Sequence, residues 1–379
     1  IQDLDNQTQI TILREFTSIH PSVEWKFRDT ATKYYWQKSV DGLGIEPDPI
    51  VFKKLYPLYG QADIVGSSKT RNQAVSADLT DNLKRLKKVL EGCQKKLEFH
   101  LLDVYLTKVK NNLERLSEGN FVSNDETQII EMLTRKIHPL LRKLKDRYQE
   151  LPKKLINEYF KVLDPNLDIV YRHRKAYEDS VAQLNQTIGK FIETEDKKMQ
   201  NILPHYFEKY TTDGVEYNIY LGQSILQNEE FHDFYIKDFR LWQLIKMVEV
   251  THLVEKTAKN LPVPLKTAQL IFVYNNTMSI RFDMEEKQFD VDGTYNVRYE
   301  ILKKRIDKAV IKGTGERLTV QGKIAIVWLQ EKDRREYLEY LYHLIEKGFI
   351  TDEIEELELE KLQGAEGLKA FRVSVILDS

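Results

Sequence analysis

The apolar residues of this chain change their spacing near residue 205, and this change constrains the fold more than any other feature. Before it, leucines recur every three or four positions, which is the period of a helix with one buried face. After it, Val215–Leu221 alternates with period two, which is typical of a β-strand. We therefore predict an α+β protein: a mainly helical N-terminal half, forming a long-helix bundle, and then an α+β domain with a mostly antiparallel sheet.

One apolar stripe dominates the helical half. It predicts a single helix of about 40 residues with one face in a core, formed by Leu79, Leu83, Leu86, Leu90, Cys93, Leu97, Leu101, Val104, Leu113 and Leu116. Gly119 ends the stripe. Three further helices are predicted: one capped by Ser123 and kinked at Pro139, one opened by Pro152, and one over 168–202. Four such helices form a bundle or a helical stalk.

The second half contains shorter segments that alternate in type. About six strands and three helices are predicted from their periods and turn signals: strands 215–221, 268–274, 278–283, 323–329, 355–362 and 368–377, and helices 229–260, 297–312 and 331–347. The strand over 323–329 is apolar at almost every position. This predicts a central place in the sheet, where both faces are covered.

Residues 1–75 carry weaker signals. Helices are predicted around 9–20 and 22–37, and residues 44–66 are expected to run extended because prolines interrupt them. We expect three parts: N-terminal helices with an extended crossover (1–75), a helical bundle or connector (76–203) and an α+β domain (204–379).

The charge balance and the single cysteine exclude several classes of protein. The 57 Lys and Arg residues against 59 Asp and Glu give a net charge of −2, unlike the strongly basic balance of nonspecific nucleic-acid binders. Cys93 is alone, so no intrachain disulfide can form. No apolar run approaches the roughly 20 residues that span a bilayer. The chain starts without Met or a signal peptide, so we expect a piece of a longer, cytoplasmic protein.

The most distinctive stretch runs from Tyr59 to Arg71, and both of these residues are candidates for ligand binding. Its Gly66-Ser67-Ser68 run opens a helix, whose free N–H groups suit a phosphate or a carboxylate, with Arg71 and Lys69 as the countercharges. The spacing does not match a P-loop. The alternative is that Ser67 or Ser68 only caps the helix.

Acidic residues cluster between positions 283 and 292. Asp290 and Asp292 are weak candidates for binding a metal such as a hard divalent cation, and Arg298 nearby is a candidate for binding a phosphate. The spacing of an EF-hand is not met. The alternative is therefore a solvated hairpin turn.

The remaining candidates are isolated residues. Eight histidines are present, and no pair has the spacing of a zinc hydrolase. His205 is a candidate ligand-binding residue, and a structural histidine is the alternative. Arg240 and Trp242 are candidates for lining a ligand pocket, with core packing as the alternative. The G-x-S-x-G motif is absent and Cys93 lies on the apolar stripe, so we assign no catalytic residue.

Three segments resemble one known family: Tyr56–Ile64, Pro204–Glu216 and Phe289–Glu300. They are similar to parts of poorly characterised long bacterial proteins described as GAF-domain-containing, which means related to the small-molecule sensor domains of cyclic-nucleotide phosphodiesterases and phytochromes. The resemblance covers nearly the whole chain and brings no catalytic residues. If the C-terminal domain is itself GAF-like, the resemblance implies helices on one side of an antiparallel sheet and a ligand on the other.

These features lead us to expect a non-enzymatic bacterial signal-transduction or small-molecule-sensing module, in which a helical connector joins a ligand-binding domain. The long apolar stripe suits a coiled-coil dimer that transmits a shift. The alternatives are a nucleotide-signalling enzyme, of the cyclic-nucleotide phosphodiesterase or cyclase type, and a protein-binding scaffold.

The expected partners are a small-molecule or nucleotide ligand and a second copy of the chain or a partner protein, without membrane or nucleic acid. The sequence identifies no cofactor.

Overall fold

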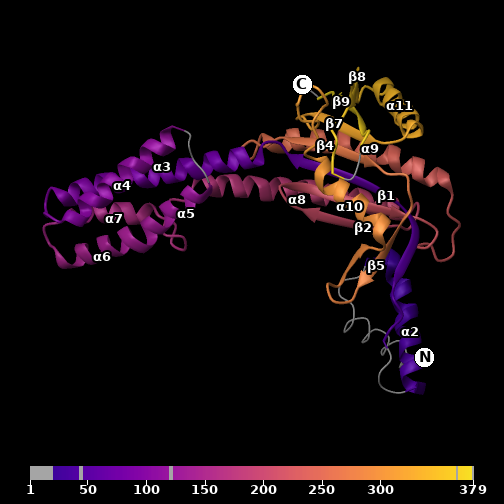
Figure 1. Cartoon of the computed structure of the whole chain (residues 1–379), viewed down its shortest axis with the longest axis horizontal. Coiled ribbons are helices and arrows are strands. Elements are labelled where there is room, and N and C mark those ends of the chain that lie inside the picture. The colour runs from indigo at the N-terminus through magenta and orange to yellow at the C-terminus, as the bar shows by residue number, and fades with distance from the viewer. Residues whose placement is uncertain (1–19, 42–45, 119–122, 364–365, 378–379) are drawn as a thin grey trace. The chain divides into compact units, whose positions relative to one another are not determined.

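The computed structural model describes residues 20–41, 46–118, 123–363 and 366–377 (Figure 1). The chain forms two compact units. We call residues 66–182 the helical unit, and residues 1–65 together with 183–379 the sheet unit. The helix expected over 9–20 falls outside the described residues.

The helical unit is built from helices that pack around one apolar core. In Figure 1, α3, α4, α6 and α7 run alongside one another. Its elements are α3 (Ser67–Gln94), α4 (His100–Ser117), α5 (Ser123–Glu131), a π-helical segment (Met132–Ile137), α6 (His138–Arg147), α7 (Lys153–Val162) and the start of α8 (His173–Gln200).

The prediction of a single helix of about 40 residues is wrong, because the apolar stripe is divided between α3 and α4. The backbone N–H of Leu97 bonds to the carbonyl of Cys93 at 3.0 Å, and Phe99 then adopts an extended conformation before α4 begins. The two helices pack against each other, and Leu101 and Val104 of the stripe are exposed. Apolar spacing stays in phase through so short a turn, so it could not reveal the break.

The helical pattern changes next to Pro139, where the sequence predicts a kink. Pro139 lies in the first turn of α6, directly after the π-helical segment, where the N–H of His138 reaches back to the carbonyl of Leu133. A wider turn at this point accommodates the hydrogen bond that proline cannot make. The helices predicted from Ser123, after Pro152 and over 168–202 are confirmed.

The sheet unit contains nine strands among the described residues, in the order β2-β3-β1-β4-β7-β9-β8, with β5 and β6 extending from β1. All neighbours are antiparallel except β4 and β7, which confirms an α+β fold with a mostly antiparallel sheet. β7 lies between β4 and β9, as predicted. The strands are β1 (Val51–Ile64), β2 (Tyr206–Thr211), β3 (Gly214–Leu221), β4 (Thr267–Val273), β5 (Met278–Asp283), β6 (Gln288–Val291), β7 (Lys323–Trp328), β8 (Ile350–Glu358) and β9 (Lys369–Val375).

β1 is a strand of the sheet that the sequence did not predict. Residues 44–66 were expected only to run extended, but β1 pairs with β5 along its first part and with β3 and β4 along its second part. The sheet therefore takes one of its inner strands from the N-terminal part of the chain, and the helical unit is inserted between β1 and β2. Strands β2 and β6 were also missed.

The two faces of the sheet are covered by different helices. A Cβ on Gly60 would lie 2.5 Å from Cε of Met247 in α9 (Asp233–Ala258), so glycine permits the close packing of α9 on this face. Tyr59 is on the opposite face, next to Tyr299 of α10 (Thr294–Ile306) in the same core cluster. The unit also contains α2 (Glu24–Asp41) and α11 (Glu331–Glu346), close to the predicted helices.

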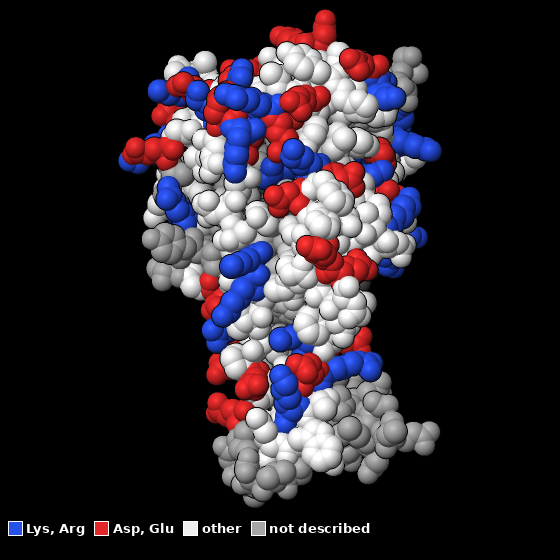
Figure 2. Space-filling view, turned by 90° about the vertical axis from the view of Figure 1, so that its right-hand side faces the viewer, with Lys and Arg blue, Asp and Glu red and all other residues white. Residues whose placement is uncertain are grey.

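The outer surface has a mixed character. Basic and acidic side chains are interspersed over the face drawn in Figure 2, which agrees with the net charge of −2. Among the described helices, none has the length and apolarity needed to cross a membrane.

Candidate functional site

Polar side chains gather on the α10 side of strands β2, β3 and β1. Every second residue of a strand faces the same side of a sheet, and the register aligns these residues into two rows: Glu208, Asn218 and Tyr59, followed by Tyr210, Glu216 and Gln61. A cavity of about 370 Å³ opens here between the strands, β6 and α10. We call it the sheet-face cavity; its lining is Glu208, Tyr210, Glu216, Tyr220, Ile280, Glu286, Gln288, Phe289, Asp290, Val291, Glu300, Lys303 and Lys304.

Glu208 is the most constrained carboxylate of the cavity. Its Oε1 accepts hydrogen bonds from Nδ2 of Asn218 at 2.8 Å and from the hydroxyl of Tyr220 at 2.9 Å, and its Oε2 accepts one from Tyr210 at 3.2 Å. Burial raises the pKa of Glu208, and the charge of Lys303 opposes this shift. The strands thus fix a carboxylate that lacks full solvation.

α10 closes the cavity from the other side. The hydroxyl of Tyr299 donates to Oδ1 of Asn218 at 3.1 Å, and Nζ of Lys303 donates to Oε1 of Glu300 at 2.8 Å. The same Nζ lies 5.9 Å from the centre of the Tyr59 ring, and the Tyr59 hydroxyl donates to Glu216 at 2.8 Å. Burial raises the pKa of the Tyr59 and Tyr299 hydroxyls, so both act as protonated donors.

A second acidic group lies at the end of β1. The pKa of Asp63 is raised to about 6, first by burial and then by the charge of Asp307, while Arg317 lowers it. Asp213, whose backbone carbonyl accepts from the N–H of Ile64 at 2.9 Å, adds a further negative charge. Three carboxylates and a guanidinium therefore act on one another at this end of the sheet.

The three segments that carry the family resemblance meet at the sheet-face cavity. The second contributes Glu208 and Glu216 and the third contributes Asp290 and Glu300, while Tyr59 of the first lies beside the lining and donates to Glu216. The sequence singled out these segments without indicating that they are neighbours. The pairing of β1 with β3 and the packing of α10 bring them together.

The acidic cluster forms a hairpin turn between β5 and β6. The side chain of Asp283 accepts from the backbone N–H groups of Glu285 and Glu286, as in the alternative interpretation. Asp292 pairs with Arg281 at 3.1 Å, whereas Glu286 and Asp290 line the sheet-face cavity. In the described part of the chain, no three His, Cys, Asp or Glu side chains are grouped as metal ligands. Arg298 is exposed on α10.

The predicted anion site at the start of α3 belongs to the helical unit, apart from Tyr59. Gly66, with a φ of 69°, is the residue before the helix, so neither Ser67 nor Ser68 occupies the N-cap position. A left-handed φ favours glycine at this position. Arg71 forms an ion pair with Glu126 at 3.5 Å, which takes up the charge expected for an anion.

His205, Arg240 and Trp242 do not line the sheet-face cavity. His205 is fully buried between Asp196, at 2.7 Å from Nε2, and the carbonyl of Leu203, at 2.8 Å from Nδ1. The Arg240 guanidinium bonds to Glu336 at 3.1 Å, joining α9 to α11. Trp242 is half-buried, with its ring 6.3 Å from that of Phe239. These contacts favour structural roles for His205 and Arg240.

Sequence reasoning missed Asn218, Tyr220 and Lys303 as site residues, and also the group around Asp63. A signal was present: polar residues occupy alternate positions of β3, where an apolar face would be usual. Cys93 is buried and burial raises the pKa of its thiol to about 11, which agrees with an inert side chain.

Comparisons with known proteins give a faint likeness. No family model matches the chain, and no curated protein matches it. Among solved structures it is similar to the guanylyl cyclase Cya2, with a TM-score of 0.29 and 12% identity over 53% of this chain and 83% of that chain. It is also similar to the adenylyl cyclase CyaB from P. aeruginosa, with a TM-score of 0.30 and 13% identity over 54% and 84%. At TM-scores of this size, the two cyclases carry no argument about the function of this chain.

Proposed function

We propose that this chain is a ligand-binding module of a signal-transduction protein, and that the sheet-face cavity is its ligand site. The observation that carries this proposal is the hydrogen-bonded carboxylate of Glu208, which opens into a cavity between two packed layers. Cavities with a few fixed polar groups and aromatic walls are the usual form of small-molecule sites. The resemblance to GAF-domain-containing proteins supports the same role.

The lining of the cavity indicates the class of ligand. Its carboxylates outnumber its two lysines, and one lysine, Lys303, is already paired with Glu300. The rings of Tyr210, Tyr220 and Phe289 add aromatic faces. Carboxylates beside aromatic rings suit an organic cation, which gains both ion pairing and cation–π contact. We therefore propose a small amine or related cation as the ligand.

Thermal unfolding with a panel of compounds tests this proposal. Small organic amines should raise the unfolding midpoint, because a ligand at 100 times its dissociation constant stabilises by about 2.7 kcal/mol. Glu208→Gln should abolish the shift, while Glu353→Gln, exposed on β8, should preserve it. A panel of amines, nucleotides and metabolites that shifts nothing would contradict the ligand site itself. A shift with anions alone would contradict only the ligand class.

The apolar stripe does not support the proposal that the chain binds a second copy or a partner protein. Most of the stripe is buried inside the helical unit of the same chain, so it is not free to form a coiled coil. We retain a second copy or a partner protein as a proposal for the output of the module. Sedimentation of the purified chain, with and without the bound amine, measures whether association depends on the ligand.

A further inference from the structure

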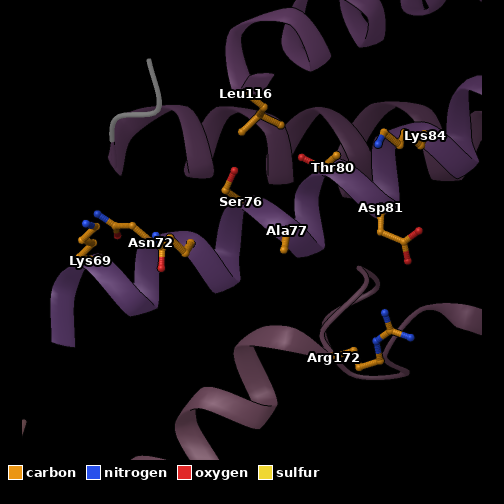
Figure 3. Close-up of a pocket in the computed structure, with 10 residues that line it drawn as sticks. Lys69, Asn72, Ser76, Ala77, Thr80, Asp81, Lys84, Leu116 and Arg172 are labelled. Atoms are coloured by element: carbon orange, nitrogen blue, oxygen red, sulfur yellow. The ribbon is translucent and has the colours of Figure 1, made fainter. Parts of the chain in front are cut away.

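A long groove follows α3 in the helical unit. One cavity of about 960 Å³ runs along the helix from Lys69 to Lys84, and a second of about 450 Å³ shares Thr80 and Lys84 with it and continues to Lys88. Figure 3 shows the lining side chains arranged along α3, with Leu116 of the neighbouring helix on one side and Arg172 on the other. We call this surface the α3 groove.

The α3 groove is basic. Lys69, Lys84 and Lys88 line it and have no ion-pair partner among the described residues, and Arg172 adds a fourth cation. Asp81 is the acidic residue of the larger cavity, and its charge is taken up by Arg85 at 2.9 Å. The surface therefore presents several positive charges that nothing within the described chain neutralises.

The basic residues are spread over a long distance. From Lys69 to Lys84 the helix rises about 22 Å, at 1.5 Å per residue. Polar side chains lie between them, and Ser76 and Thr80 have no side-chain hydrogen-bond partner among the described residues. A ligand that used both ends would be elongated, and an extended peptide of about seven residues covers this distance.

The net charge of the helical unit is positive, like that of the α3 groove. Residues 66–182 carry 23 Lys and Arg against 17 Asp and Glu, a net charge of +6, while the rest of the chain carries −8. Among the described residues that line the two cavities, none is aromatic. Binding of a single-stranded nucleic acid usually relies on aromatic rings for base stacking, so an acidic peptide fits better than a nucleic acid.

We propose that the α3 groove binds an extended acidic peptide segment of a partner protein. Carboxylates of the peptide pair with Lys69, Lys84 and Arg172, and its backbone bonds to the uncharged polar side chains between them. Charge complementarity of this kind sets partner choice and the rate of association. The proposal uses residues of the helical unit alone and is independent of the ligand in the sheet-face cavity.

Fluorescence anisotropy of the full chain with a labelled oligo-glutamate peptide of about seven residues tests the proposal. The peptide should bind at low salt and weaken as salt rises. The double variant Lys69→Glu with Lys84→Glu should reduce affinity by about tenfold or more. The matched control is Lys108→Glu with Lys110→Glu, which makes the same charge change at exposed positions of α4 outside the groove and should have a much smaller effect.

A third variant separates shape from charge. Ser76→Tyr fills the groove without altering the net charge, so it should also weaken the peptide. An equal loss of peptide affinity in the groove and control variants would mean that only the net charge matters, and it would overturn the proposal. Failure of the peptide to bind, or tighter groove-dependent binding of a single-stranded oligonucleotide of equal length, would overturn it as well.

Discussion

The two units of this protein differ in the surroundings of their buried polar groups. In the helical unit, Asn82 bonds to Tyr159 at 2.9 Å and to the N–H of Val170 at 2.8 Å, and His138 bonds to the same Tyr159 at 2.7 Å. These groups satisfy one another inside a closed core. In the sheet unit, the network around Glu208 opens into a cavity. A buried polar network therefore indicates a candidate ligand site only where it borders a cavity.

The units also differ in charge, which places their proposed ligands in opposite classes. The helical unit has a net charge of +6 and a basic groove, and the sheet unit has a net charge of −8 and a cavity rich in carboxylates. A chain with a net charge near zero can thus carry two surfaces that attract oppositely charged partners.

A spectroscopic difference allows the units to be followed separately. All four tryptophans, at positions 25, 36, 242 and 328, lie in the sheet unit. We expect tryptophan fluorescence to report unfolding of the sheet unit, and the part of the circular dichroism change that does not coincide with it to report the helical unit.

The largest effect is expected at Asp78. Its carboxylate is buried on α3 and accepts hydrogen bonds from the backbone N–H groups of residues 172, 173 and 174 at the start of α8. Asp78→Ala removes these bonds and should lower the free energy of unfolding of the helical unit by about 3 kcal/mol. Urea denaturation followed by circular dichroism measures the loss, and the fluorescence transition should not move.

The matched control for Asp78 lies one turn away. Asp81→Ala removes only a partly exposed pair with Arg85 on the same helix and should cost less than about 0.5 kcal/mol. An equal loss in both variants would contradict the role assigned to Asp78.

The next effect is expected in the sheet unit at Gly60. Gly60→Ala places a methyl group 2.5 Å from Cε of Met247 and 2.6 Å from the buried ring of Tyr217, so α9 or β3 must shift. We expect a loss of about 2 kcal/mol in the fluorescence transition. Gly189→Ala in α8 would meet only the flexible end of Lys209 and should be neutral or stabilising. A neutral Gly60→Ala would mean that this face is loosely packed.

A smaller effect of opposite sign is expected at Asp63. Its folded-state pKa, raised to about 6, lies above the unfolded value of 3.8, so ionisation costs stability as the pH rises between these values. Asp63→Asn removes this cost and should stabilise the sheet unit by about 1 kcal/mol at neutral pH, allowing for solvent screening. The gain should vanish below pH 3.8. A destabilised variant at neutral pH would contradict the shift.

The smallest effect is a pH dependence in the helical unit. Burial lowers the pKa of His138 below 6.5, although Asp168 opposes this, so the unfolded chain takes up a proton that the folded chain does not. Stability of the helical unit should therefore fall as the pH drops below 6.5. His138→Gln should flatten this dependence in the circular dichroism transition, whereas His100→Gln, at the exposed start of α4, should keep it. An unchanged dependence in His138→Gln would assign it to another group.

Much of the secondary structure was predictable because local periodicity encodes it. The strands over 215–221 and 323–329 and the helix after residue 331 follow from period and turn signals that tertiary contacts do not override. The turn between α3 and α4 was not predictable, since Leu97 and Leu101 keep the helical phase across it. The sequence signal was the same for one helix and for two.

The candidate site was predictable only in part. The three segments of the family resemblance contain Tyr59, Glu208 and Asp290, and all three lie at or beside the sheet-face cavity. Their roles depend on pairings between residues more than a hundred positions apart, such as Tyr59 with Asn218. Arg71, a candidate by sequence, is instead paired with Glu126.

Local sequence patterns were enough to predict the kinds of element, the mostly antiparallel α+β class and the distinctive segments, because these patterns depend on neighbours along the chain. The tertiary structure decided that β1 joins the sheet of the second half and that α10 covers its polar face. It also decided which charges are neutralised and which remain open in a cavity or groove. Those outcomes depend on contacts between distant residues, and no local pattern encodes such contacts.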